Sequence, residues 1–168
     1  MKKITFLILF LTITFSFAQN WSTGVITFNG NYSGQVDVTP TTVTLTLIGP
    51  DDRWLGMGFG VTCMTSGNDD VVIFDGTNLT DRNYIGIGVQ PAVDFSQDWT
   101  IISNTTSVGT RTLIATRARD TGDSNDFVFP AAAGGINFVW AYRGSAGFSI
   151  TSHSGNRGSV SASLGIDD

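Results

Sequence analysis

Residues 54–76 read WLGMGFGVTCMTSGNDDVVIFDG, and this stretch decides the fold. Glycine occupies positions 56, 58 and 60, and residues 71–74 form an uninterrupted apolar run. Because successive side chains of a strand point to opposite faces, the glycines leave one face of the first strand bare. The stretch therefore predicts two short strands joined by a polar loop that carries Met64.

The rest of the chain also predicts short strands. Residues 41–48 (TTVTLTLI) and 110–117 (TRTLIATR) alternate polar with apolar side chains, which is typical of strands with one buried face. No long window has a convincing helical period. Many short strands between turn signals predict an all-β, antiparallel β-sandwich. The other predicted strands are 23–28, 35–38, 71–74, 83–89, 99–103, 136–142 and 159–164.

The N-terminus predicts the compartment. Lys2 and Lys3 precede an apolar run at residues 4–17, and Ser16-Phe17-Ala18 has the small-x-small pattern of a cleavage site. We therefore expect a secretory signal peptide at residues 1–18 and one β-sandwich domain at 19–168, on a secreted or cell-surface protein. No later run is long and apolar enough to predict a membrane span.

Charge and cysteine content limit the possible partners. The net charge of −5 and the pI near 4.5 argue against nucleic acid, which needs a basic surface. The single cysteine, Cys63, cannot form an intramolecular disulfide. We interpret Cys63 as a small buried hydrophobe at a strand end rather than a ligand.

Met64 and His153 form the candidate site. Alone, a methionine usually fills a gap in a core and a single histidine in a Gly/Ser loop usually faces solvent. Together, a thioether and an imidazole are the axial ligands of cytochrome-type haem. The hypothesis is that the Met64 loop and the loop SHSGNRG at 152–158 meet and clamp a flat group. Arg157 would then meet a propionate, and Met57 offers a competing sulfur.

The order of these motifs resembles the DOMON family of β-sandwich modules, found in dopamine β-monooxygenase relatives and in the cytochrome domain of cellobiose dehydrogenase. The resemblance covers residues 24–165 and includes His153 before Asn156-Arg157-Gly158. It implies a non-covalent haem b with Met64 and His153 as iron ligands, and room for the macrocycle at Gly56, Gly58 and Gly60. The compact spacing of these motifs also resembles that of modules on proteins exported by Gram-negative bacteria. The matching pieces are residues 54–60, 64, 70–73, 97–99, 116–117, 140–141, 153 and 156–158.

Other chemistry has weaker support. The acidic loop 120–126 lacks EF-hand spacing, so we interpret it as a polar turn rather than a calcium site. Asp70 is expected to cap or hydrogen-bond the loop that aims Met64. The absence of G-x-S-x-G argues against a hydrolase, and one Cys with one His is too few for zinc.

The prediction is thus a secreted, haem-b-binding electron-transfer module and not an enzyme, with a redox partner protein or a small molecule as partner. The alternative is a carbohydrate- or other ligand-binding module without haem, since the family is thought to include sugar binders. Its stacking platforms would be the aromatic residues, which could equally be core: Trp54, Trp99, Trp140 and Tyr142. A structural adhesion domain stays open as a third possibility.

Overall fold

The computed structural model describes residues 19–167, in which every regular element is a β-strand. The expected signal peptide, residues 1–18, lies outside the described residues. None of the described residues belongs to a helix that could cross a membrane. The strands are β1 (Asn20–Ser22), β2 (Ile26–Asn29), β3 (Tyr32–Val38), β4 (Thr42–Pro50), β5 (Leu55–Phe59), β6 (Asp70–Phe74), β7 (Leu79–Asn83), β8 (Ala92–Val93), β9 (Thr100–Ser107), β10 (Thr110–Ala118), β11 (Gly134–Tyr142) and β12 (Arg157–Asp167).

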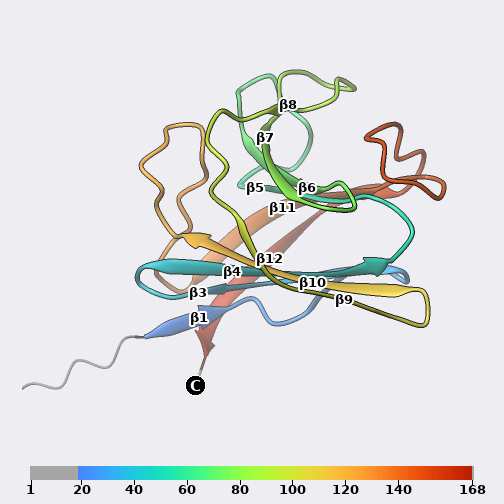
Figure 1. Ribbon diagram of the computed structural model, residues 1–168. Helices are drawn as coiled ribbons and strands as arrows, with labels where there is room; N and C mark the ends of the chain where they lie inside the picture. The colour runs from blue at the N-terminus through green and yellow to red at the C-terminus, as the bar shows by residue number, and fades with distance from the viewer. Residues whose placement is uncertain (1–18, 168) are drawn as a thin grey trace, which may run out of the picture.

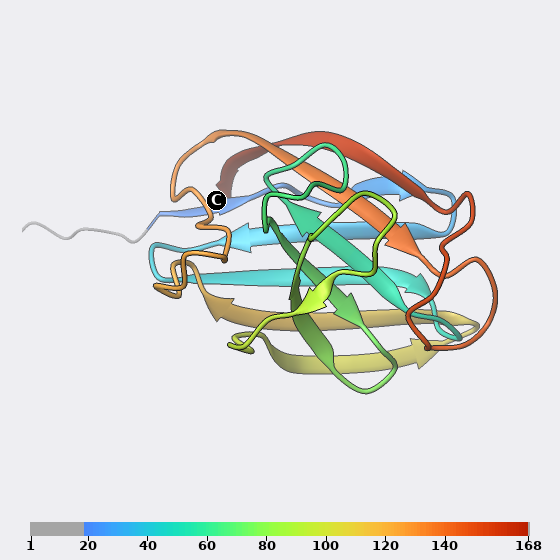
Figure 2. The ribbon, with the colours of Figure 1, turned by 90° about the horizontal axis from the view of Figure 1, so that it is seen from above.

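All neighbouring strands pair antiparallel in one continuous sheet, in the order β8-β7-β6-β5-β11-β12-β1-β3-β4-β10-β9, with β2 added beside β3. The sheet curls into two layers (Figures 1 and 2), one holding β5, β6, β7 and β11 and the other holding β3, β4, β10 and β9. The long strand β12 joins the layers because it pairs first with β11 and then, at its C-terminal end, with β1. The predicted antiparallel β-sandwich is confirmed.

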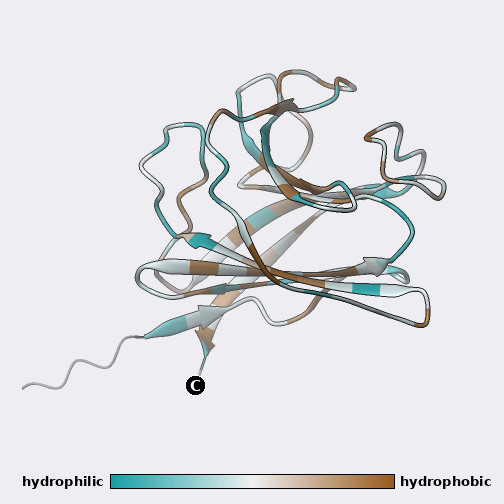
Figure 3. Cartoon of the chain, viewed as in Figure 1, coloured by the Kyte–Doolittle hydropathy of each residue, from teal (hydrophilic) through white to brown (hydrophobic). Residues whose placement is uncertain are grey.

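The core lies between the layers. Alternation along β3 and β4 buries one side chain in two, so Val36, Leu45 and Leu47 face inward while threonines of β4 face outward. From the other layer, Phe59 and Phe138 complete the core. In Figure 3 the apolar colour follows strands such as β6 and β11, while the first half of the loop between β10 and β11 is hydrophilic.

One predicted strand is wrong. The alternating sequence NYIGIGV at 83–89 predicts a strand, but the chain leaves the sheet after Asn83. The strand β7 instead begins at Leu79, and its sequence LTDRN places charged side chains in buried positions. The Tyr84 backbone is held by the chain before β6, because Tyr84 N–H donates to the Asp69 carbonyl and Asn68 N–H donates to that of Tyr84. These bonds turn the chain away from the sheet.

Candidate functional site

The glycine strand β5 separates two apolar clusters. Leu55, Met57 and Phe59 belong to the main core, so the intervening Gly56 and Gly58 lie on the outer face of their layer. That outer face carries a second cluster of buried residues, here called the outer cluster: Trp54, Val71, Ile73 and Tyr84. In a β-sandwich an outer face is ordinarily polar, because it meets water. This outer face is apolar, and residues from neighbouring loops pack over it.

The two loops predicted to form the site both reach the outer cluster. Met64, from the loop after β5, packs against it, and so does Ile150, from the loop between β11 and β12 that holds His153. Met57 is fully buried in the main core on the opposite side of β5, where it is not available as a competing sulfur. Figure 2 looks onto this layer, with the orange-red loop of residues 143–156 at one end.

His153 is held in one tautomer by its own loop. Its Nδ1 lies 2.9 Å from the Ser154 carbonyl oxygen and 3.5 Å from Arg157 Nη1. Because a carbonyl oxygen only accepts, an Nδ1–H donates to it, and in the neutral ring the Nε2 lone pair is free. Metal-binding histidines usually have their second ring nitrogen fixed in this way. The loop is closed by Asn156 N–H, which donates to the His153 carbonyl at 2.9 Å. Arg157 Nη1 also donates to the Ser154 carbonyl, at 3.3 Å, which brings its positive charge beside the imidazole.

Each of the two loops contains a non-glycine residue in the left-handed region of backbone space. These are Asn68, with φ of 67°, and Ser154, with φ of 52°. Such conformations cost free energy for residues with a Cβ and tend to persist where the surroundings impose them, often at functional sites. The surrounding structure therefore holds both loops in conformations that their backbones would not prefer in isolation.

Gly58 makes room for an aromatic ring. A Cβ at Gly58 would lie 2.8 Å from the ring and hydroxyl of Tyr84, which now covers this part of the glycine face. Burial raises the pKa of the Tyr84 phenol, so the side chain stays neutral. Gly60 differs from the other two, because it ends β5 with φ of +73° and meets the Phe127 ring. Gly56 faces Ile73 and backbone carbonyls.

The structure corrects two interpretations made near Met64. Cys63 is exposed, not buried, since the chain has already left β5 and turned into the loop. Asp70 does not bond the Met64 loop. Its Oδ2 instead accepts from the Phe127 N–H at 2.9 Å and from Arg117 at 2.8 Å. The residue that bonds within the Met64 loop is Asp69, whose carboxylate accepts from the Thr65 hydroxyl.

A buried group of charges lies on the inner side of β6 and β7. It consists of Asp70, Asp81, Asp126 and Arg117, here called the Asp–Arg cluster, and all four residues are at most 9% exposed. Arg117 Nη1 lies 3.0 Å from Asp126 Oδ2 and 3.7 Å from Asp81 Oδ2. The guanidinium also lies over the Trp99 ring, 4.9 Å from its centroid. The cluster was not predicted from the sequence, because its members come from four separate segments.

Burial raises the pKa values of the three carboxylic acids in this cluster. Desolvation, opposed by Arg117, raises the pKa of Asp70 to about 6. Desolvation and the neighbouring carboxylates raise the pKa of Asp81 to about 8. The pKa of Asp126 is also raised, again mainly by desolvation. One guanidinium therefore does not compensate three buried carboxylates.

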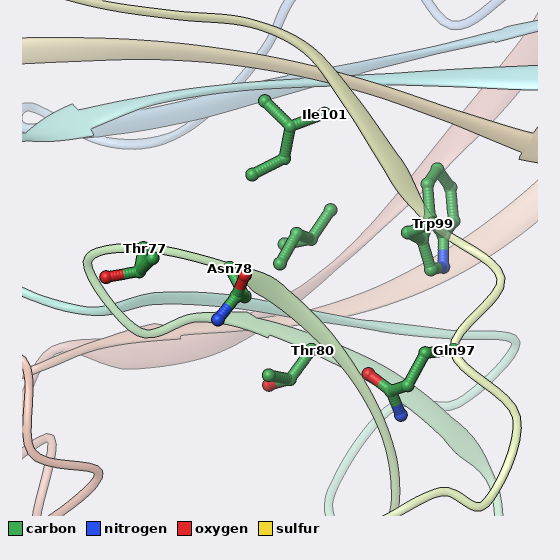
Figure 4. Close-up of a pocket in the computed structure, with 7 residues that line it drawn as sticks. Thr77, Asn78, Thr80, Gln97, Trp99 and Ile101 are labelled. Atoms are coloured by element: carbon green, nitrogen blue, oxygen red, sulfur yellow. The ribbon is translucent and has the colours of Figure 1, made fainter.

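The aromatic residues named as possible sugar platforms are buried at 4–8% exposure: Trp54, Trp99, Trp140 and Tyr142. Trp99 lines a cavity of about 510 Å³ at the open edge between β7 and β9. Figure 4 shows Trp99 and Gln97 on one side of it and Thr77 and Asn78 on the other. Gln97 already bonds backbone atoms of Asp81, including its N–H and its carbonyl. Neither the ring faces nor this amide presents an open sugar-binding surface.

Two solved structures with a similar fold are cytochrome domains. The chain is similar to the cytochrome b domain of pyranose dehydrogenase from Coprinopsis cinerea, with a TM-score of 0.58 and 16% identity over 79% of this chain and 76% of that chain. It is also similar to the cytochrome domain of Myriococcum thermophilum cellobiose dehydrogenase, with a TM-score of 0.53 and 11% identity over 87% and 82%. No protein-family model matches the chain, and no curated protein matches it. At these identities the likeness establishes the fold.

Proposed function

We propose that this chain is an exported electron-transfer module that binds one haem b, with Met64 and His153 as the axial ligands. The observation that carries the proposal is the arrangement of the outer cluster. Met64 and Ile150, which belongs to the loop of His153, pack against the same apolar surface over the glycine strand. The cytochrome domains that share this fold support the same function.

The residues present fit this cofactor. The donor set is a thioether and an imidazole whose Nε2 is free, which are the ligands of cytochrome-type haem. The Tyr84 ring now covers Gly58, so a macrocycle on this face would take the place of that ring. The chain has no C-x-x-C-H motif, so attachment would be non-covalent.

Each residue would have a distinct role. The Ser154 carbonyl fixes the His153 tautomer, and Asp69 together with Thr65 shapes the loop that presents Met64. The apolar outer cluster excludes water, and Arg157 places a positive charge beside the imidazole, where a propionate would be neutralised. When bound, haem iron with this ligation supplies a one-electron couple of raised potential. A redox protein or small molecule would be the electron-transfer partner.

The first test is an absorption spectrum of the chain purified after haem supplementation, before and after reduction with dithionite. A sharp Soret band with resolved α and β bands in the reduced protein is expected for low-spin, six-coordinate iron. A spectrum without haem bands would contradict the proposal and favour a ligand-binding module without haem.

The ligands are tested by substitution. His153→Ala should abolish haem binding, and Met64→Ala should retain haem with an altered spin state and a lowered potential, because the soft sulfur that stabilises ferrous iron is lost. Met57→Leu is the matched control, since Met57 lies in the main core and should leave the spectrum unchanged. Wild-type spectra for both ligand variants would show that the assignment is wrong.

A further inference from the structure

We propose that the Asp–Arg cluster is a binding site for a hard divalent cation of the Ca²⁺ type, held by the carboxylates of Asp70, Asp81 and Asp126. Each residue offers one carboxylate oxygen, and the three oxygens lie within 4.8 Å of one another. The site lies between the two layers, on the opposite side of β6 from the outer cluster. The inference does not depend on haem binding.

The observation that points to a ligand is the state of Asp81. Asp70 and Asp126 are engaged with Arg117, through a 2.8 Å hydrogen bond and a 3.0 Å ion pair. The Asp81 side chain is only 1% exposed and is directed at the same guanidinium, yet neither of its oxygens has a hydrogen-bond partner. A buried carboxylate left without partners is costly. Its ion-pair partner within the protein, Arg117 Nη1, is 3.7 Å away and too far for a hydrogen bond, so a bound cation would supply the close contact that Asp81 lacks.

The charge and the donor type select the partner. With all three carboxyl groups ionised, the group and its one guanidinium carry a formal charge of −2 in a buried space, which one divalent cation would neutralise in place of protons. All the free donors are oxygens, the ligands that Ca²⁺ and Mg²⁺ prefer, and no histidine or cysteine is in the group. Asp70 Oδ1 has no partner either, so it is available beside Asp81. A softer metal such as zinc would find none of its preferred ligands here.

The position of the cluster predicts what the cation would hold together. Asp70 begins β6, Asp81 lies in the middle of β7, and Asp126 ends the acidic loop that precedes β11. Asn125, beside Asp126, accepts a 2.8 Å hydrogen bond from the Asn68 amide, so the acidic loop is also tied to the Met64 loop. Cation binding would fasten the acidic loop to the sheet.

The experiment measures Ca²⁺ binding directly, by calorimetric titration of the chelator-treated chain, and by thermal unfolding in Ca²⁺ and in EDTA. We expect one equivalent to bind and to raise the unfolding temperature, because a ligand that binds only the folded state stabilises it. A second readout uses Tb³⁺ as a luminescent substitute for Ca²⁺. Trp99 lies against Arg117, so excitation of tryptophan should sensitise Tb³⁺ emission, and excess Ca²⁺ should quench it.

The decisive variant is Asp81→Asn, which keeps the side-chain shape and removes one ligand charge. It should weaken Ca²⁺ binding at least about tenfold, since even substitutions outside the ligand shell have effects of that size. Asp167→Asn is the matched control, because it removes one exposed charge at the end of β12 and should bind as the wild type does.

Two results would overturn the inference. A wild-type chain whose unfolding temperature is the same in Ca²⁺ and in EDTA would show that protons, not a cation, neutralise Asp81. Equal Ca²⁺ binding by wild type and Asp81→Asn would show that the metal is held adventitiously elsewhere. Neither result would change the haem spectrum, so this inference and the proposed function fail separately.

Discussion

The outer cluster and the Asp–Arg cluster occupy the two faces of the same strand. In β6, Val71 and Ile73 point outward into the apolar cluster that Met64 covers, while Asp70 points inward to Arg117. The usual arrangement of a β-sandwich is thus locally reversed, with an apolar outer face and charges in the interior. Both features would cost free energy on their own. The apolar outer face is stabilised by loops that shield it from water, and the buried charges are stabilised in part by their ion pairs with Arg117.

The difference between the two faces explains why each is proposed to bind a different kind of ligand. An apolar face on which the Tyr84 ring now covers Gly58 suits a flat, largely apolar group in place of that ring, whereas a buried excess of negative charge suits a small cation. The two sites share a strand but no side chain. Substitutions on one face of β6 should therefore leave the ligand response of the other unchanged, and the following predictions test that separation.

The largest effect is expected for Arg117→Ala. It removes the only cation among three buried carboxylates and should lower the free energy of unfolding in EDTA by about 3–5 kcal/mol, as measured by urea denaturation. Arg53→Ala is the control, because Arg53 pairs with the half-exposed Asp52 and should cost less than about 1 kcal/mol. Equal losses for the two variants would mean that the buried pairs are no stronger than a surface pair.

An intermediate effect is expected for Gly58→Ala on the outer face. The added Cβ would overlap the Tyr84 ring and should destabilise the fold by about 1–3 kcal/mol. In a Tyr84→Ala background the same substitution should cost much less, which a double-mutant cycle would measure as coupling. Gly165→Ala is the matched control because nothing lies within 4 Å of its Cβ position. An unchanged cost in the Tyr84→Ala background would show that the ring is not what Gly58 accommodates.

The last prediction concerns a slope rather than the loss of one contact, namely a pH dependence of stability in EDTA. The pKa of Asp81 rises from 3.8 to about 8 on folding, so between these values the folded chain holds a proton that the unfolded chain releases. The free energy of unfolding should therefore fall as pH rises through this window, by at most about 1.4 kcal/mol per pH unit for one proton. Asp70, with a pKa of about 6, adds to the slope at its lower end.

Asp81→Asn should flatten this pH profile, because the amide does not titrate in this range. Urea denaturation between pH 5 and pH 8.5, at about 0.15 M salt, would measure the slope of both proteins. A wild-type profile that rises with pH would mean that Asp81 is stabilised as a carboxylate. Adding Ca²⁺ to the wild type should reduce the slope, since the cation then replaces the proton.

Strands with one buried face were predictable from the sequence. The alternation in 41–48 and 110–117 reports the burial pattern directly, and β4 and β10 are found there, each extending slightly further at its C-terminal end. The same logic misplaced the strand at 83–89, because Ile85 and Ile87 alternate with glycine but are exposed at 48% and 82%. Alternation alone does not distinguish a strand from a loop that exposes apolar residues.

The two clusters were predictable to different degrees. The outer cluster follows from a local signal, the bare glycine face followed by Met64, and it could be anticipated before the structure was known. The Asp–Arg cluster joins residues from β6, β7, β10 and the acidic loop, which are up to 56 positions apart between Asp70 and Asp126. No single segment carries its signal. The inner position of Asp81 becomes visible only when the register of β7 against β6 is known.

The exposure of Cys63 has a practical consequence for handling the protein. It is the only thiol of the chain, it is accessible, and it directly precedes Met64. A maleimide dye, a spin label or a gold electrode would therefore attach at a single point, without any engineered cysteine. Immobilised in this way, every molecule would turn the same loop towards the surface and form a uniformly oriented film.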